Sequence, residues 1–274
     1  MTLDLRALAL CFPCALACAP SEHDGEAAQS RLSIIQGTRD TEDFATLGVM
    51  HTDGTLGCSG VLISRHVALT AAHCFSVPPA PTRVFFGSDP LSDGMFGAIA
   101  SFQQHTAFEF SSLLNDIAVI VVDGGAPVWV TPAVASEWAP SVGEDARFVG
   151  FGWTQINQSG DYALKYQVSA TIDSVEPTTF GYGVATCQGD SGGPAFVRAR
   201  GLEVAAGLTS SGDVRCAEYG VDTRVDAYRD FWRPFVDLND TPACAADGLC
   251  PPDCAQPDPD CPLDGNESCA VALA

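Results

Sequence analysis

Short apolar runs rich in Val, Ile, Phe and Thr recur along the chain from Ile34 to about Asn239. Gly, Pro, Asp and Ser separate them, which is typical of proteins built from many short strands. The clearest runs are Gly60–Ile63, Ile117–Val122, Phe148–Trp153 and Tyr166–Ile172. Because no long helical periodicity lies among them, the pattern predicts an all-β sandwich or barrel of antiparallel strands. One terminal helix is expected around Ala227–Val236.

The first residues do not follow this pattern. Arg6 precedes a mostly apolar run, Ala7–Ala19, that is followed by polar residues, as in a signal peptide. Ala15 and Ala17 are small residues suited to cleavage after residue 17. We therefore assign residues 1–17 as a signal peptide, which predicts a secreted protein.

Residues 18–33 are largely polar and acidic and are interpreted as a pro-segment or tether. Cys18 leaves an alternative open, because a cysteine directly after the cleavage point also resembles a bacterial lipoprotein signal. If Cys18 is lipidated, the protein is anchored at the cell envelope, and this is the only membrane tether that the sequence suggests.

Residues 240–274 differ in composition from the segment 34–239, which we take as one domain. Their cysteines lie among Pro and Asp residues at positions Cys244, Cys250, Cys254, Cys261 and Cys269. We expect a small disulfide-stapled tail, with a calcium site on its Asp residues as the alternative. Zinc fits less well, because the cysteine spacings do not match the usual ligand pairs.

Charge and cysteine content narrow the function. The chain has 34 acidic and 13 basic residues and a net charge of -21, a field that repels phosphate backbones and argues against nucleic-acid binding. Twelve cysteines are too many for a reducing compartment unless they bind metal or do redox chemistry, so they agree with export.

Ser191 lies in the segment Cys187-Gln188-Gly189-Asp190-Ser191-Gly192-Gly193-Pro194. Its glycines allow a tight turn that points backbone amides into one small space, as an oxyanion hole requires. A serine hydroxyl is a weak nucleophile unless a base takes its proton, and the base needs a group that holds its tautomer. His73, within Leu69–Cys74, and Asp116, directly before an apolar strand, are the candidates.

With these segments, the chain resembles the trypsin and chymotrypsin family of serine proteases over about Ile34 to Asp237. The chain order His, Asp, Ser is that of this family, and it differs from the order in subtilisin-like enzymes and α/β-hydrolases. The chain lacks other cysteine pairs common in animal members, as secreted bacterial relatives do. The resemblance implies two six-stranded antiparallel β-barrels, a C-terminal helix and, here, an added Cys-rich tail.

The resemblance also implies roles for the site residues. His73 would deprotonate Ser191, Asp116 would orient His73, and the amides of Gly189 and Ser191 would receive the oxyanion. Disulfides are implied between Cys58 and Cys74 and between Cys187 and Cys216.

Ile34 begins a segment that resembles the mature N-terminus of the family. Its freed ammonium would enter the protein and pair with Asp190, so that cleavage before Ile34 by another protease activates a zymogen. Leaving the buried carboxylate unpaired costs roughly 3–5 kcal/mol, enough to hold the Gly189 loop out of its active geometry. The preceding residue is Ser33, where most relatives carry Arg or Lys.

By the same resemblance, Ala185 forms the base of the primary specificity pocket, with Gly212 and Gly220 leaving its walls open. An open pocket with a methyl floor favours apolar or aromatic substrate side chains. Asp222 is the alternative: it could project a carboxylate near the floor and attract Lys or Arg, or simply be a solvated acid at a strand end. Ser210 matches the segment that pairs with the substrate backbone.

The sequence thus predicts a serine endopeptidase that acts on proteins or peptides through an acyl-enzyme on Ser191, without a cofactor or metal. The alternative is a catalytically silent relative that uses the barrels as a binding module.

Overall fold

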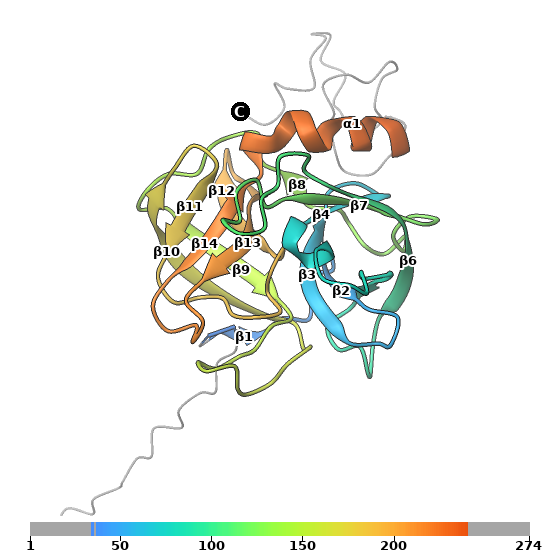
Figure 1. Ribbon diagram of the computed structural model, residues 1–274, viewed down its shortest axis with the longest axis horizontal. Coiled ribbons are helices and arrows are strands. Elements are labelled where there is room, and N and C mark those ends of the chain that lie inside the picture. The colour runs from blue at the N-terminus through green and yellow to red at the C-terminus, as the bar shows by residue number, and fades with distance from the viewer. Residues whose placement is uncertain (1–33, 36, 241–274) are drawn as a thin grey trace, which may run out of the picture. The chain divides into compact units, whose positions relative to one another are not determined.

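The computed structural model describes residues 34–35 and 37–240 (Figure 1). The expected signal peptide, residues 1–17, the pro-segment, residues 18–33, and the five tail cysteines lie outside the described residues.

The first half of the described chain forms a closed barrel of six antiparallel strands. These are β2 (Thr46–Met50), β3 (Leu56–Leu62), β4 (Val67–Thr70), β5 (Arg83–Phe86), β6 (Met95–Gln104) and β7 (Ala118–Val122). Their order around the barrel is β2-β3-β4-β7-β6-β5. Buried side chains such as Leu47, Val84 and Ile120 fill its interior.

The second half forms a second ring of antiparallel strands beside the first (Figure 1). These are β9 (Asp145–Gly150), β10 (Tyr166–Val175), β11 (Thr179–Tyr182), β12 (Pro194–Ala199), β13 (Leu202–Gly212) and β14 (Gly220–Arg224). The order β9-β10-β11-β14-β13-β12 closes because β12 pairs with β9. Two short strands add to it: β1 (Thr38–Arg39) pairs with β10, and β8 (Val134–Ala135) pairs with β13. The predicted all-β fold of two six-stranded barrels with a C-terminal helix is confirmed.

The strand expected at Phe148–Trp153 ends earlier than its apolar pattern suggests, because β9 stops at Gly150. Beyond it, the Phe151 amide donates to Ser59 Oγ at 3.0 Å and the Gly152 amide to Asp190 Oδ1 at 2.8 Å. These amides therefore donate to the side chains of Ser59 and Asp190 and not to the backbone of a neighbouring strand.

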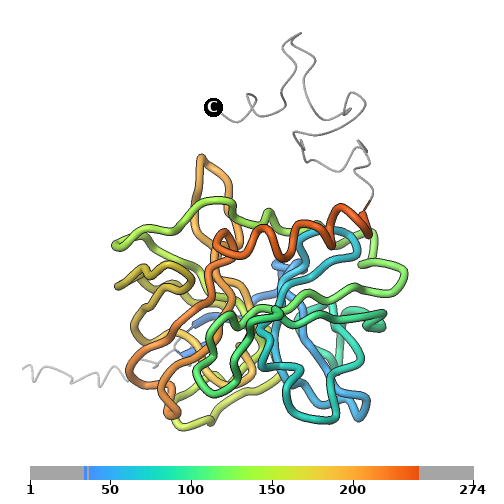
Figure 2. The backbone as a smooth tube through the Cα atoms, turned by 45° about the horizontal axis from the view of Figure 1, so that its top comes forward, coloured from blue at the N-terminus to red at the C-terminus, as the bar shows by residue number. Residues whose placement is uncertain are grey.

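The terminal helix α1 (Arg229–Asn239) follows a 3₁₀ turn at Asp226–Tyr228 and lies across the first barrel (Figure 2). Trp232 is buried in a cluster that contains residues of both barrels, including Leu69 and Phe196. The helix therefore covers the seam between the barrels. No helix within the described part of the chain is both long and apolar enough to cross a bilayer.

A buried polar network holds the N-terminal segment against the second barrel. The side chain of Lys165 is fully buried, and its Nζ donates to the Asp43 carbonyl and lies 4.0 Å from Asp40 Oδ1. Burial lowers the pKa of Lys165 to about 8, although Asp40 and Asp43 oppose the shift. Arg147 on β9 also forms an ion pair with Asp43. The segment between Ile34 and β2 is thus fixed by several partners.

Asp240, which follows α1, anchors the end of the domain to the first barrel. Its carboxylate accepts hydrogen bonds from the Ser64 hydroxyl and the His66 amide, and its Oδ1 lies 2.7 Å from His66 Nδ1. Its own amide donates to the Val236 carbonyl at 2.9 Å. The first residue of the expected tail is therefore bound to the domain.

We expect Asp240→Ala to lower the free energy of unfolding by about 1–3 kcal/mol, because three donors lose a charged acceptor. Urea unfolding of the two proteins measures the difference. Asp237→Ala is the matched control, because Asp237 forms an exposed i,i+4 pair with Arg233, which is worth about 0.5 kcal/mol or less. Equal losses in the two variants would contradict the anchoring role of Asp240.

Candidate active site

His73 and Asp116 meet at the edge of the first barrel. A 3₁₀ helix, Ala72–Phe75, follows β4 and presents His73, while Asp116 lies two residues before β7. Asp116 Oδ2 lies 2.7 Å from His73 Nδ1, and Oδ1 accepts the His73 amide at 2.8 Å. Since a carboxylate only accepts, Nδ1 carries the proton of this hydrogen bond, which leaves Nε2 of a neutral ring as an acceptor.

A third donor reaches Asp116 from the second barrel. The Ser210 hydroxyl on β13 lies 2.6 Å from Asp116 Oδ2. The Asp116 side chain has no exposed surface, so these three hydrogen bonds replace water around its oxygens. From the sequence, Ser210 was expected only to pair with the substrate backbone, and its hydrogen bond to Asp116 was not predicted.

The Ser191 loop is shaped by glycines at two positions. Gly189 and Gly192 have φ angles of 99° and 78°, which side-chain-bearing residues rarely adopt. A Cβ on Gly192 would lie 2.0 Å from Thr70 Oγ1, and one on Gly189 would lie 2.7 Å from the Cα of Gly152. Both positions therefore need glycine for conformation and for space.

Backbone hydrogen bonds fix this loop to both barrels. The Gly192 amide donates to the Thr209 carbonyl at 2.6 Å, and the Thr209 amide donates to the Gly193 carbonyl at 2.9 Å. The Ser59 amide on β3 donates to the Ser191 carbonyl at 2.9 Å. Because Thr209 precedes Ser210, the Ser191 loop and Asp116 are tied to the same stretch of β13.

Ser59 is a further site residue that sequence reasoning missed. Its buried hydroxyl donates to the Gly189 carbonyl at 2.8 Å and accepts the Phe151 amide at 3.0 Å. This position orients the peptide on one side of the Ser191 loop. A serine inside a strand carries no sequence signal for such a role, because its partners are distant in the chain.

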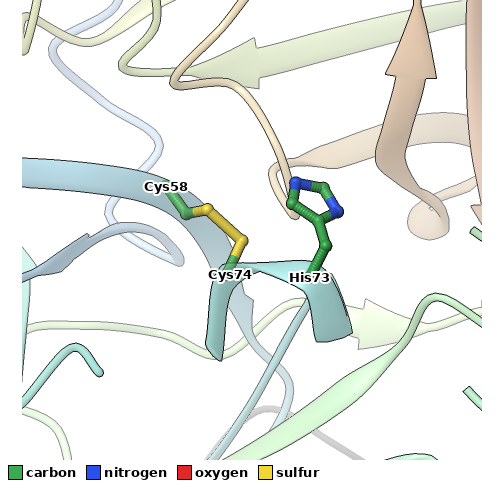
Figure 3. A group of neighbouring side chains, drawn as sticks. All are labelled: Cys58, His73 and Cys74. Carbon is green, nitrogen blue, oxygen red and sulfur yellow. A yellow bond between two sulfur atoms is a disulfide. The ribbon is translucent and has the colours of Figure 1, made fainter. Parts of the chain in front are cut away.

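A cavity of about 480 Å³ has His73, Gly189 and Ser191 on its walls. The disulfide Cys58–Cys74 also lines it, and Figure 3 shows His73 beside this disulfide on the 3₁₀ helix. The atoms of Cys58, His73 and Cys74 lie within the spacing of a metal site. Both sulfurs are bonded to each other, however, so neither is a thiolate ligand.

The second disulfide, Cys187–Cys216, lies at the start of the Ser191 loop. Both pairs are those that the family resemblance implied. Within the described chain, the amides of Gly189 and Ser191 donate to no protein acceptor. They remain available for an oxygen of a bound molecule.

Asp190 is buried beside this loop. Its carboxylate accepts the Gly152 amide at 2.8 Å and the Cys187 amide at 2.9 Å. Burial raises the pKa of Asp190 to about 7, and the two amides only partly oppose it. Ile34 is buried, and Ile35 packs in one cluster with Cys187, Cys216 and Trp153.

The expected specificity pocket differs from its predicted shape. Ala185 is buried, and Gly212 and Gly220 are partners in the β13–β14 pairing. The wall at Gly220 is not open: a Cβ there would lie 2.3 Å from Cε2 of Tyr182, which is its partner on β11. The ring of Tyr182 fills this space because the two residues point to the same face of the sheet.

Asp222 is not a solvated acid at a strand end. It lies in the middle of β14 with no exposed surface, and its Oδ1 accepts the Tyr182 hydroxyl at 2.7 Å. The Tyr182 hydroxyl oxygen also lies 3.0 Å from Thr186 Oγ1. The sequence did not single out Tyr182, although its two-residue spacing from Phe180 matches an inward-facing strand.

Comparison with known proteins agrees with these observations. The trypsin family profile matches residues 34–232. Trypsin alpha-4 of Lucilia cuprina is 29% identical over 66% of this chain and 80% of its own length. Trypsin of Saccharopolyspora erythraea is 28% identical over 68% of this chain and 89% of its own length.

Trypsin eta of Drosophila melanogaster is 28% identical over 83% of this chain and 95% of its own length. The structure of neuropsin, a serine protease expressed in the limbic system of mouse brain, superposes with a TM-score of 0.67 at 23% identity. It covers 74% of this chain and all of the neuropsin chain, and it supports the fold. With a family match over most of the described residues, this chain belongs to the trypsin family of serine proteases.

Proposed function

We propose that the protein is a serine endopeptidase with Ser191 as nucleophile, His73 as general base and Asp116 as the residue that orients His73. The hydrogen bond of 2.7 Å between Asp116 and His73, on the wall of the cavity that also contains Ser191, carries the proposal. Its substrates are proteins or peptides, in keeping with the family.

In the acylation step, His73 Nε2 takes the proton of the Ser191 hydroxyl while Oγ attacks the carbonyl carbon of the substrate. The carbonyl oxygen becomes an oxyanion, and His73 becomes an imidazolium. Asp116 stabilises this cation through Nδ1 and prevents the ring from turning. The bonds of Asp116 to the His73 amide and to Ser210 hold the carboxylate in place.

The amides of Gly189 and Ser191 receive the oxyanion. Two features support this role: both amides lack an acceptor among the described residues, and Ser59 holds the Gly189 carbonyl on the other side of the peptide. One such donor typically contributes about 3 kcal/mol of transition-state stabilisation.

The tetrahedral intermediate then collapses. The bond from carbon to the peptide nitrogen breaks, the leaving amine takes the proton from His73, and an ester on Ser191 Oγ remains. Water repeats the sequence: His73 takes its proton, its oxygen attacks the ester carbon, and Ser191 leaves with the proton from His73. The enzyme is restored and needs no cofactor.

Activation by cleavage before Ile34 is also proposed. The ammonium freed at Ile34 would pair with Asp190 and stabilise the loop that carries Gly189 and Ser191. The proposal is supported by the burial of Ile34, by the packing of Ile35 against the Cys187–Cys216 disulfide, and by an Asp190 carboxylate that accepts only backbone amides.

Secretion is proposed from the signal-like residues 1–17, with lipid anchoring through Cys18 as the alternative. The two disulfides support export, because such bonds persist in oxidising compartments. An activating protease is then expected to be a partner outside the cell.

Cleavage should depend on the Ser191 nucleophile and the His73 base. A protein that begins at Ile34 should cut peptides of a mixed library at internal bonds, and Ser191→Ala should lower kcat by roughly 10⁴-fold or more. His73→Ala should cause a loss of similar size, because base and nucleophile act as a unit. Mass spectrometry of the fragments measures the cuts.

If the folded protein with a verified Ile34 terminus cuts no better than Ser191→Ala, the endopeptidase proposal fails and the silent binding module is favoured. Circular dichroism of all three proteins provides the folding control.

Activity should depend on a chain that begins at Ile34. A chain that begins at Ser33 differs from the mature chain by one residue and should have activity lower by about 10²–10⁴-fold, which corresponds to a lost buried ion pair of roughly 3–5 kcal/mol. Asp190→Asn in the mature chain should cause a similar loss. Equal activity of the Ser33 and Ile34 chains would refute the mechanism.

The mature chain should also lose activity as the pH rises above about 8, the value of a free α-amino group, because pairing with Asp190 raises the pKa of the Ile34 ammonium and the ion pair breaks only when this group deprotonates. The pair should lower the pKa of Asp190 from its value of about 7, because an adjacent ammonium favours the carboxylate. Kinetics across pH with a substrate that does not titrate measure this limb.

A further inference from the structure

Tyr182, Thr186 and Asp222 form a chain of hydrogen bonds inside the second barrel. The Tyr182 hydroxyl lies 2.7 Å from Asp222 Oδ1 and 3.0 Å from Thr186 Oγ1. Thr186 follows Ala185, the expected base of the specificity pocket, and the Tyr182 ring fills the space beside Gly220. The chain of hydrogen bonds therefore lies beside the residue that the family resemblance assigns to the base of the pocket.

The surroundings of Asp222 are mostly apolar. On one side its strand pairs it with Phe180, and on the other with Thr209. A Cβ added to Gly207 would meet Asp222 Oδ2 at 2.6 Å, so Oδ2 lies against the backbone of β13. This oxygen is buried and has no hydrogen-bond partner among the described residues.

No described Lys, Arg or His forms an ion pair with Asp222. The groups that face it are Tyr182 from β11, Thr209 from β13 and, through space, Asp190 from the Ser191 loop. Asp190 is itself an acid, so it disfavours a second negative charge. The Tyr182 hydroxyl, with Thr209 beside it, replaces only a small part of the lost hydration of a carboxylate.

Burial is accordingly the main cause that raises the pKa of Asp222 to about 8, and Asp190 adds to it. Burial, followed by the charge of Asp222, also raises the pKa of Tyr182 well above its usual value. Both shifts favour the uncharged forms of these groups near neutral pH.

We propose that Tyr182 and Asp222 form an uncharged floor of the primary specificity pocket, so that the enzyme cleaves after apolar or aromatic side chains at neutral pH and accepts Lys or Arg only when Asp222 is ionised. This proposal rests on the proposed endopeptidase function. In this proposal Asp222 is a neutral carboxylic acid at the floor. A fixed negative charge there would instead select basic substrates.

The test uses the chain that begins at Ile34 and two peptides that differ only in Phe or Lys before the cleaved bond. The ratio of kcat/KM for Lys to that for Phe is measured at about pH 6 and about pH 9.5, on either side of the Asp222 pKa of about 8. We expect Phe to be preferred at about pH 6, and the ratio to rise roughly tenfold at the higher pH as the floor becomes charged. A ratio of rates cancels the alkaline loss of the Ile34 ammonium.

Asp222→Asn should remove this rise, because the amide cannot ionise. Glu218→Gln is the matched control: it removes one negative charge from the exposed Arg215–Glu218 pair in the loop between β13 and β14, and it should retain the rise. A preference for Lys at about pH 6 that Asp222→Asn abolishes would overturn the proposal. A ratio that does not change with pH in the unmodified enzyme would overturn it as well.

A binding measurement separates failure of this proposal from failure of the proposed function. Ser191→Ala is titrated calorimetrically with benzamidinium, an aromatic cation, and with benzamide, its neutral counterpart of the same shape. We expect no preference for the cation at about pH 6 and a preference at about pH 9.5 that Asp222→Asn lacks. A preference for the cation at both pH values, or at neither, overturns the uncharged floor even if the protein cuts no peptide.

Discussion

The burial of the Asp116 carboxylate is the constraint on which the site depends. A carboxylate without exposed surface needs donors from the protein, and here they come from both barrels: His73 beside β4 and Ser210 on β13. The two barrels can satisfy this acid only when they pack in one arrangement. The same stretch of β13 binds the Ser191 loop through Thr209, so the packing that satisfies Asp116 also brings Ser191 to the cavity that His73 lines.

Two other buried acids are less well supplied with donors, and this difference separates their roles. Asp190 accepts two backbone amides, and burial still raises its pKa to about 7. Asp222 accepts one hydroxyl, and burial raises its pKa to about 8. An acid with this deficit is suited to receive a cation that arrives later, as proposed for Asp190, or to remain protonated, as proposed for Asp222.

The short apolar runs allowed prediction of an all-β sandwich or barrel. The motifs around His73, Asp116 and Ser191 carried the family resemblance, and it was this resemblance that implied two barrels and the contact between His73 and Asp116. The pocket floor could not be predicted in this way. Whether Tyr182 reaches Asp222 depends on the register of β11 against β14, and these two residues are 40 positions apart in the chain. Gly220 suggested open space in the pocket wall, but the ring of Tyr182, its partner on the neighbouring strand, fills that space.

The roles of Ser59 and of the end of β9 escaped prediction for a similar reason. The run Phe148–Trp153 has the composition of one continuous strand, yet the amides of Phe151 and Gly152 bind Ser59 and Asp190. Apolar periodicity describes which face a side chain occupies and contains no information on which polar group an amide will bind. Such long-range polar contacts are set by tertiary packing.

The proposed activation and the proposed specificity would be linked through the field between Asp190 and Asp222. In the chain before cleavage, a negative charge on Asp190 adds to the cost of charging Asp222. Pairing of Asp190 with the Ile34 ammonium would cancel much of this contribution, because a dipole acts over a shorter range than a charge. Burial is the larger cause of the raised pKa of Asp222, and an ion pair at Asp190 would not remove it. The uncharged floor should therefore persist in the mature enzyme, with the onset of its ionisation at a somewhat lower pH than in the precursor.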